Sequence, residues 1–175
     1  MKIAVMALSG GMDSTSLLLR LIREGNTVYT IGFNYGQKHI VELSRAQDNI
    51  DYLSENGYKI SHNVVDLSSL MSMFTGSLTS NEDVPKGHYE EQQMKSTVVP
   101  NRNAIFSSMI YGYALSLSKQ FECNVSISLG VHSGDHAIYP DCRPEFYQSL
   151  NEAFEIGNWD SENVKLDLPY IDGDK

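Results

Sequence analysis

Short runs of Val, Ile and aromatic residues alternate along the chain with segments in which apolar residues repeat at helical spacing. The runs lie at 2–8, 27–35, 58–67, 124–131 and 164–171, and their composition predicts β-strands. The first two helical stripes each end before a glycine, Gly25 or Gly57, which we expect to cap the helix. The stripe residues are Leu17, Leu18, Leu21 and Ile22, then Ile40, Leu43, Ala46, Ile50 and Leu53. Further helices are predicted over 102–119 and 144–156.

Strands separated by helices predict an α/β fold: a Rossmann-like, doubly wound parallel sheet of about five strands with helices on both faces. With 175 residues, of which 41% are hydrophobic, we expect a single domain spanning 1–175. The stretch 68–99 contains many Gly, Ser, Asn and charged residues. It is the one long irregular segment, and such loops are typical of lids and binding elements.

Composition narrows the classes of partner and compartment. The formal charge of −9 and the lack of a long basic run argue against a large RNA or DNA partner. No segment approaches the roughly 18 apolar residues of a membrane helix, and the apolar run at the N-terminus is too short for a signal peptide. The two cysteines, Cys123 and Cys142, fit a reducing compartment. We therefore expect a cytoplasmic protein with a small-molecule substrate and with no nucleic-acid or membrane partner.

The segment "SGGMDS" joins the first predicted strand to the first helix, where ligands of doubly wound sheets bind. Gly10 and Gly11 allow the backbone to approach a ligand, and amides of the turn and of a helix beginning near Ser14 favour an anion there. Asp13 is expected either to cap the helix or to hold a Mg²⁺ that accompanies phosphates. The alternative is an ordinary helix start. The candidate nucleotide-binding residues are Leu8, Ser9, Gly10, Gly11, Met12, Asp13, Ser14, Thr15, Ser16, Leu17 and Leu18.

This segment resembles the PP-loop of the N-type ATP pyrophosphatases, which hold the β and γ phosphates of ATP while a substrate attacks the α phosphorus. Asparagine, GMP and NAD synthetases and tRNA-thiolating enzymes share that loop. Three other segments narrow the resemblance: "FNYGQKH" (33–39), "STVVPNRN" (96–103) and "GVHSGDHAIYPDCRPEF" (130–146). Together with the PP-loop they resemble the QueC family of queuosine-precursor biosynthesis, from residue 1 to about 171, and "YPDCRPEF" is the most specific part.

The resemblance implies an ATP-dependent carbon–nitrogen ligase that uses Mg²⁺. Its substrate would be 7-carboxy-7-deazaguanine, its nitrogen source free ammonium, and its product 7-cyano-7-deazaguanine (preQ0), formed through an adenylated carboxylate and then an amide. Catalytic roles are expected for Asp13, Lys38 and Arg102. Lys38, with Gln37 and His39, is expected to face ATP at the end of the second strand; the alternative is a solvated helix start.

Arg102 is expected to bind an anionic group because its planar guanidinium suits a carboxylate or a phosphate. The alternative is an ordinary surface arginine. The neighbouring Asn103 is expected either to contact substrate or to cap the helix.

The loop from His132 to Arg143 is dense in polar groups, but its spacing fits no standard zinc pattern, so we expect no metal site there. The resemblance suggests a substrate pocket in which the deazaguanine stacks on Tyr139. Either Asp135 or Asp141 would accept hydrogen bonds from its N1–H and 2-amino group. The alternative is a loop that only shapes the pocket. The candidate substrate-binding residues are Arg102, Asn103, Asp135, His136, Tyr139, Asp141 and Arg143.

One departure concerns Zn²⁺. Members of the family usually continue beyond the last strand and carry a four-cysteine zinc site, whose ligands are absent from this chain with its two cysteines. We expect either a truncated form or a natural short form, and a homodimer is compatible with both. Three other functions stay open at this stage: a tRNA-thiolating relative, a QueC-like defence ligase acting on a protein, and a non-catalytic nucleotide-binding module.

Overall fold

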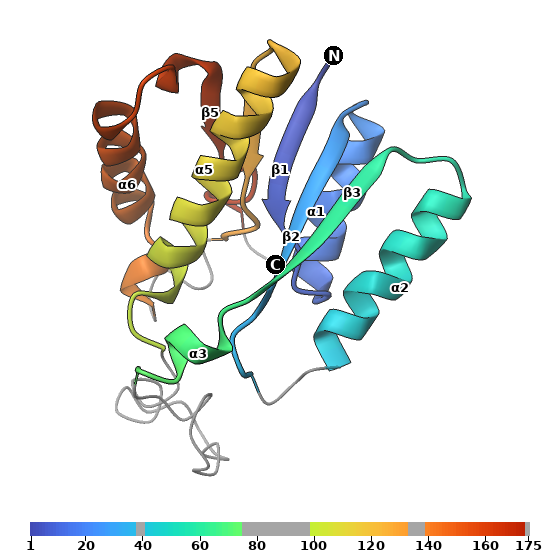
Figure 1. Ribbon diagram of the computed structural model, residues 1–175, viewed down its shortest axis with the longest axis horizontal. Coiled ribbons are helices and arrows are strands. Elements are labelled where there is room, and N and C mark those ends of the chain that lie inside the picture. The colour runs from blue at the N-terminus through green and yellow to red at the C-terminus, as the bar shows by residue number, and fades with distance from the viewer. Residues whose placement is uncertain (38–40, 75–98, 133–138, 174–175) are drawn as a thin grey trace.

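The computed structural model describes residues 1–37, 41–74, 99–132 and 139–173 (Figure 1). The strands are Ile3–Ala7 (β1), Thr27–Asn34 (β2), Ile60–Asp66 (β3), Val125–Ser128 (β4) and Val164–Asp167 (β5). The α-helices are Met12–Arg23 (α1), Val41–Glu55 (α2), Ser68–Met71 (α3), Arg102–Phe121 (α5) and Pro144–Gly157 (α6), and two short 3₁₀ helices are Pro140–Cys142 (η2) and Ser161–Asn163 (η3).

The strands form one parallel sheet in the order β3-β2-β1-β4-β5. On β1, Ile3 lies opposite Thr27 of β2 on one side and Val125 of β4 on the other. The predicted α/β parallel sheet is confirmed. Because the chain first builds outward from β1 through β2 and β3 and then crosses to β4, the order reverses between β1 and β4. In such sheets the crevice at the carboxyl ends of these two strands is the usual ligand site.

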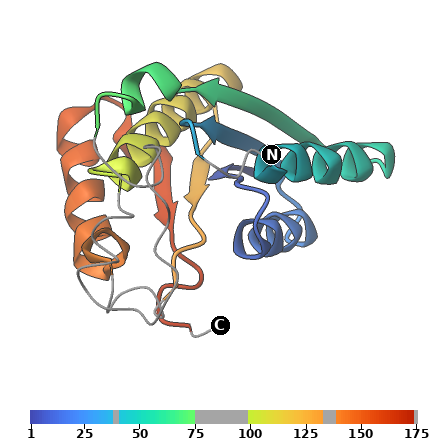
Figure 2. The ribbon, with the colours of Figure 1, turned by 90° about the horizontal axis from the view of Figure 1, so that it is seen from below.

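Helices cover both faces of the sheet, with α1 and α2 on one side and α5 and α6 on the other (Figure 2). Successive residues of β1 point to opposite faces, as in any strand. Ala4 and Met6 pack with α1 and α2, whereas Ile3 and Val5 pack with α5 and α6. This two-sided burial explains why β1 is apolar throughout rather than alternating. None of the helices within the described ranges is long and apolar enough to cross a membrane.

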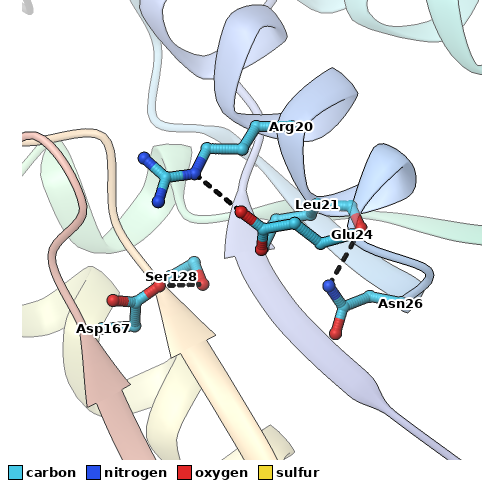
Figure 3. Close-up of polar contacts among 6 residues, drawn as sticks. All are labelled: Arg20, Leu21, Glu24, Asn26, Ser128 and Asp167. Carbon is cyan, nitrogen blue, oxygen red and sulfur yellow. Dashed lines mark hydrogen bonds and ion pairs between the residues drawn. The ribbon is translucent and has the colours of Figure 1, made fainter.

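The two predicted glycine caps are confirmed, and both follow the same hydrogen-bond scheme. Gly25 has φ +82°, its N–H donates to the Ile22 carbonyl (2.9 Å), and the next N–H, of Asn26, donates to the Leu21 carbonyl (3.1 Å). The Asn26 side chain donates to that same carbonyl, and in the same last turn Arg20 pairs with Glu24 (Figure 3). Gly57, with φ +84°, closes α2 in the same way. A left-handed residue after the last turn satisfies carbonyls that would otherwise be unpaired.

Several element boundaries differ from the predictions. β4 ends at Ser128 and β5 at Asp167, where Ser128 donates a hydrogen bond to the Asp167 carboxylate (Figure 3). β5 stops early because Pro169 has no N–H for the ladder, and the chain turns there instead, with the Ile171 N–H donating to the Leu168 carbonyl. The stretch predicted to be irregular begins with the short helix α3, and its residues 75–98 lie outside the described residues.

Candidate active site

The loop between β1 and α1 contains the two glycines singled out in the sequence, and their surroundings differ. Gly10 has φ +81°, and a Cβ there would overlap the Glu42 carbonyl oxygen of α2 and lie 3.0 Å from the Ala46 amide nitrogen. A Cβ at Gly11 would meet only the Ser9 hydroxyl, at 3.3 Å. Packing against α2 therefore excludes a side chain at Gly10, whereas the approach of a ligand to the backbone of either glycine stays a prediction. Gly11 leaves its backbone accessible.

The hydroxyl groups of Ser9 and Ser14 hold this loop in shape. Their oxygens lie 3.1 Å apart, the Gly11 N–H donates to the Ser9 hydroxyl (3.3 Å), and the Ser14 hydroxyl donates to the Gly11 carbonyl (3.1 Å). The loop is thus preorganised before any ligand binds. α1 begins at Met12 with Gly11 as its N-cap, two residues earlier than predicted. The first N–H groups of the helix lie at the mouth of the loop, where they suit an anion.

Asp13 lies in the first turn of α1 and faces a histidine from the other side of the switch point. Its Oδ2 is 3.7 Å from Nε2 of His132, whose side chain is only 8% exposed, against 40% for Asp13. The segment after β4 also lies close to α1 at Gly130: a Cβ added to this glycine would be 3.8 Å from the Asp13 carbonyl oxygen. Because Gly11 is the N-cap, the alternative that Asp13 caps the helix is wrong. Its carboxylate remains accessible at the crevice between β1 and β4.

The other candidate residues of the loop divide by exposure. Leu8, Leu17 and Leu18 are buried in the core on the α1 and α2 side, so only their backbone is available to a nucleotide. Met12 and Ser16 are exposed, and the Thr15 hydroxyl faces Asn49 of α2 at 3.5 Å. The part that these residues play in binding stays a prediction.

Arg102 begins α5 after Asn101, which has φ +58° and serves as the N-cap. The guanidinium carbon of Arg102 lies 5.7 Å from the centroid of the Tyr35 ring, which follows β2. The predicted segments 33–39 and 96–103 therefore meet through these two residues. Asn103 lies inside the first turn of the helix, so the alternative that it caps α5 is wrong.

The turn after β2 is closed by Gln37, a residue that the sequence placed facing ATP. Its buried side chain accepts a hydrogen bond from the Tyr35 N–H (2.9 Å) and donates one to the Phe33 carbonyl (3.1 Å). With both ends of the amide engaged by backbone, Gln37 shapes the turn rather than meeting a ligand. Lys38 and His39 lie outside the described residues.

The segment that follows β4 and leads into α6 brings Tyr139, Asp141 and Arg143 to the carboxyl edge of the sheet. Tyr139 is half-buried and precedes η2, Asp141 is half-buried within it, and Arg143 is the exposed N-cap of α6. Burial raises the pKa of the Tyr147 phenol well above its usual range, as do the neighbouring Cys142 and Asp141, whereas Arg102 lowers it. Arg102 and Asp141 thus both lie near Tyr147. Asp135 and His136 lie outside the described residues.

The sequence analysis gave no role to three residues of this edge: Tyr35 and His132, which lie in segments that it singled out, and Tyr147, which does not. A signal existed for two of them, because Tyr35 belongs to a polar segment after a strand and His132 begins the polar loop after the next strand across the switch point. Tyr147 had no signal, since it lies in an ordinary apolar stripe of α6. Within the described ranges, His, Cys, Asp and Glu side chains form no group of three or more that could hold a metal ion.

Comparison with known proteins places these features in a family. A family model described as queuosine biosynthesis protein QueC matches residues 3–175. The 7-cyano-7-deazaguanine synthase of Hahella chejuensis is 46% identical over 169 residues, covering 96% of this chain and 68% of the relative. The synthase of Pseudoalteromonas translucida is 44% identical over 172 residues, covering 98% of this chain and 73% of the relative.

Among solved structures, a predicted subunit of tRNA methyltransferase from Methanocaldococcus jannaschii superposes with a TM-score of 0.54 at 15% identity, covering 98% of this chain and 68% of that one. At this identity the likeness supports the α/β fold alone. The family model and the curated relatives, by contrast, match nearly the whole chain. The chain therefore belongs to the QueC family.

Proposed function

We propose that this chain is an ATP-dependent carbon–nitrogen ligase that converts 7-carboxy-7-deazaguanine and ammonia into 7-cyano-7-deazaguanine for queuosine biosynthesis in the cytoplasm. The family and the names of the curated relatives support this activity. The structural observation that carries the proposal is the meeting of the loop after β1 with the segment after β4, where Asp13 and His132 lie 3.7 Å apart. That meeting point is the crevice in which doubly wound sheets bind nucleotides.

The proposed reaction has two activations. In the first, a carboxylate oxygen of the substrate attacks the α phosphorus of ATP and pyrophosphate leaves, which gives an acyl-adenylate. Ammonia then attacks the acyl carbon, loses a proton and displaces AMP, which gives an amide. In the second, the amide oxygen attacks the α phosphorus of another ATP and pyrophosphate leaves, which gives an adenylated amide. Loss of the remaining N–H protons and departure of AMP with that oxygen leave the nitrile.

The chain's contribution at the ATP end is to fix the phosphates. The preorganised loop and the first turn of α1 present backbone N–H groups and the positive end of the helix dipole. Gly11, where only the Ser9 hydroxyl is near, allows a phosphate to approach the backbone closely. Fixing the phosphates orients the α phosphorus for attack, and the N–H groups stabilise charge that develops on the leaving pyrophosphate.

Mg²⁺ fits this arrangement as a companion of ATP. The ion usually binds through one or two carboxylates, water and substrate phosphates rather than in an all-protein cage. Asp13 supplies one accessible carboxylate at the mouth of the loop. When bound there, Mg²⁺ would shield the phosphate charges from the incoming carboxylate.

Zn²⁺ does not fit the two cysteines of the chain. Cys123 lies between α5 and β4, at the amino edge of the sheet, whereas Cys142 lies in η2 at the carboxyl edge. A structural zinc site draws its ligands together around one ion. The two thiols therefore do not belong to one zinc site.

We further propose that Arg102 and Asn103 receive the substrate carboxylate, that Lys38 faces ATP, and that the loop from His132 to Arg143 recognises the base. The half-buried Tyr139 provides a ring for stacking, and Asp141, Asp135, His136 and Arg143 provide polar contacts. Arg102 suits the carboxylate because its guanidinium can donate two parallel hydrogen bonds to two oxygens.

The deciding experiment is incubation of the full chain with ATP, Mg²⁺, ammonium and 7-carboxy-7-deazaguanine, followed by mass spectrometry. We expect the amide to appear first, then the nitrile, with AMP accumulating at each activation. Because the chain is acidic, turnover should proceed without tRNA and depend little on salt. A strict requirement for tRNA, or AMP release with a different acceptor, would contradict the proposal.

A further inference from the structure

We infer that Tyr35 is a positioning residue whose ring holds the Arg102 guanidinium in the orientation that receives an anionic group. The inference rests on the proposed function, in which Arg102 binds the substrate carboxylate or an ATP phosphate. Its starting observation is the distance of 5.7 Å between the guanidinium carbon and the centroid of the Tyr35 ring. This lies within the range at which a cation is attracted to an aromatic face.

The Tyr35 ring is itself fixed from two sides. Its backbone N–H is held by the Gln37 side chain, which also binds the Phe33 carbonyl and so sets the shape of the turn. Its ring lies 5.6 Å from that of Phe106, one turn beyond Arg102 on α5. Phe106 in turn stacks on Phe33, with centroids 4.0 Å apart and planes within 8°. The strand, the turn and the helix therefore share one aromatic cluster that presents Tyr35 to Arg102.

The choice of an aromatic partner has a consequence for binding. Among the residues that the structure describes, no carboxylate lies within ion-pair distance of Arg102. A carboxylate partner would occupy some of the guanidinium N–H donors and neutralise its charge, whereas a ring face needs none of the donors. Within the described part of the chain, no carboxylate therefore occupies the donors that Arg102 would offer to an incoming anion. Because the long side chain is already ordered by the ring, less conformational entropy is lost when the anion binds.

The test combines Tyr35→Leu, Tyr35→Phe, Arg102→Met and the double variant Tyr35→Leu/Arg102→Met. Tyr52→Leu is the matched control, because Tyr52 is 66% exposed on α2, away from the crevice. Calorimetry with ATP and with 7-carboxy-7-deazaguanine, each alone, shows which of the two ligands depends on Arg102. Urea unfolding of the same set measures the coupling between Tyr35 and Arg102 without any ligand.

We expect Tyr35→Leu to weaken binding of the ligand that Arg102→Met weakens, by about two- to fivefold, which matches an exposed cation–π contact. Tyr35→Phe, which keeps a ring, should restore most of this loss. In the Arg102→Met background the Tyr35→Leu change should have no further effect on that ligand. The Tyr52→Leu control should bind both ligands as the parent does.

An equal loss from Tyr35→Leu with and without Arg102, or a Tyr35→Phe variant as weak as Tyr35→Leu, would overturn the inference. The unfolding cycle separates this failure from a failure of the proposed function. If the parent makes no nitrile, the function fails, but non-additive unfolding energies still support the contact. If the parent makes the nitrile but the Tyr35 and Arg102 changes are additive both in ligand binding and in urea unfolding, the function stands and the role of Tyr35 is wrong.

Discussion

Replacing Gly10 with Ala should destabilise the protein far more than the same change at the adjacent Gly11. Gly10 has φ +81°, and its added Cβ would overlap the Glu42 carbonyl oxygen of α2. Gly11 has φ −75° and ψ 167°, a conformation open to any residue, and its added Cβ meets only a hydroxyl that can rotate away. The pair therefore isolates helix packing from local backbone preference.

The expected loss in free energy of unfolding for Gly10→Ala is the sum of two costs. Holding a non-glycine residue in the left-handed region costs about 1–2 kcal/mol, and forcing a methyl group into a packed contact costs about 1–3 kcal/mol. The sum of roughly 2–5 kcal/mol corresponds to a fall in Tm of roughly 4–20 °C for a protein of this size. At Gly11, a poorer N-cap costs about 1 kcal/mol, and the less flexible unfolded chain returns about 0.4–1 kcal/mol.

The assay is urea and thermal unfolding followed by far-ultraviolet circular dichroism, with ATP calorimetry on the same samples. Gly10→Ala should show a lower midpoint at an unchanged slope, and Gly11→Ala should unfold close to the parent. Equal midpoints for the two variants, or a Gly10→Ala variant as stable as the parent, would refute the reasoning that α2 imposes a glycine at position 10.

Three further predictions concern ligands and pH. Asp13→Ala and Gly11→Val should each weaken ATP binding by about tenfold or more, at least ~1.4 kcal/mol, and unchanged affinity in both would remove the site. Asp141→Ala or Asp135→Ala should cost about 1–3 kcal/mol of deazaguanine binding with ATP binding retained; calorimetry showing parent-like base binding in both would place base recognition elsewhere. Burial lowers the pKa of His62 below 6.5, against the opposing effect of Asp51. The imidazole of His62 therefore binds a proton more readily in the unfolded chain than in the folded one, so the free energy of unfolding should fall as pH drops through about 6.5. Over the same pH range, the urea midpoint of His62→Gln should fall less than that of the parent.

The sheet could be predicted from the sequence, and so could the place of the candidate loop at its carboxyl edge, because both depend on local patterns. A run such as that at β1 is apolar because both faces of a central parallel strand are buried, and the turn after it must lie at the carboxyl edge. Such features can be predicted without knowing which segments distant in sequence lie together in the fold. The strand predicted over 164–171 was too long, because Pro169 cannot join a ladder and β5 ends at Asp167.

The details of the candidate site could not be predicted because they depend on contacts between segments that are distant in sequence. No side chain fits at Gly10 because α2 passes beside it. The letters "SGG" do not indicate that this helix lies there. His132 reaches Asp13 only because β4 is placed next to β1. Gln37 looks like a ligand-facing polar residue until its two hydrogen bonds to the local backbone are seen. The pairing of Arg102 with Tyr35 likewise joins segments that are far apart in sequence.

Because β1 is central in the sheet, its two neighbouring strands become available at different times during synthesis of the chain. Its contacts with β4 include a hydrogen bond from the Ser126 hydroxyl to the Ile3 carbonyl, across 123 positions of sequence. At about 5–20 residues per second, a ribosome needs roughly 6–25 s to cover that interval. The buried residues of the cluster that β1 shares with α1 and α2 all lie within the first 53 residues, so they can assemble while the nascent chain grows. Until β4 emerges, one edge of β1 exposes unpaired backbone groups that another chain can bind. The crevice can therefore form only after β4 has emerged, and until then the exposed edge of β1 is a site at which the nascent chain can aggregate.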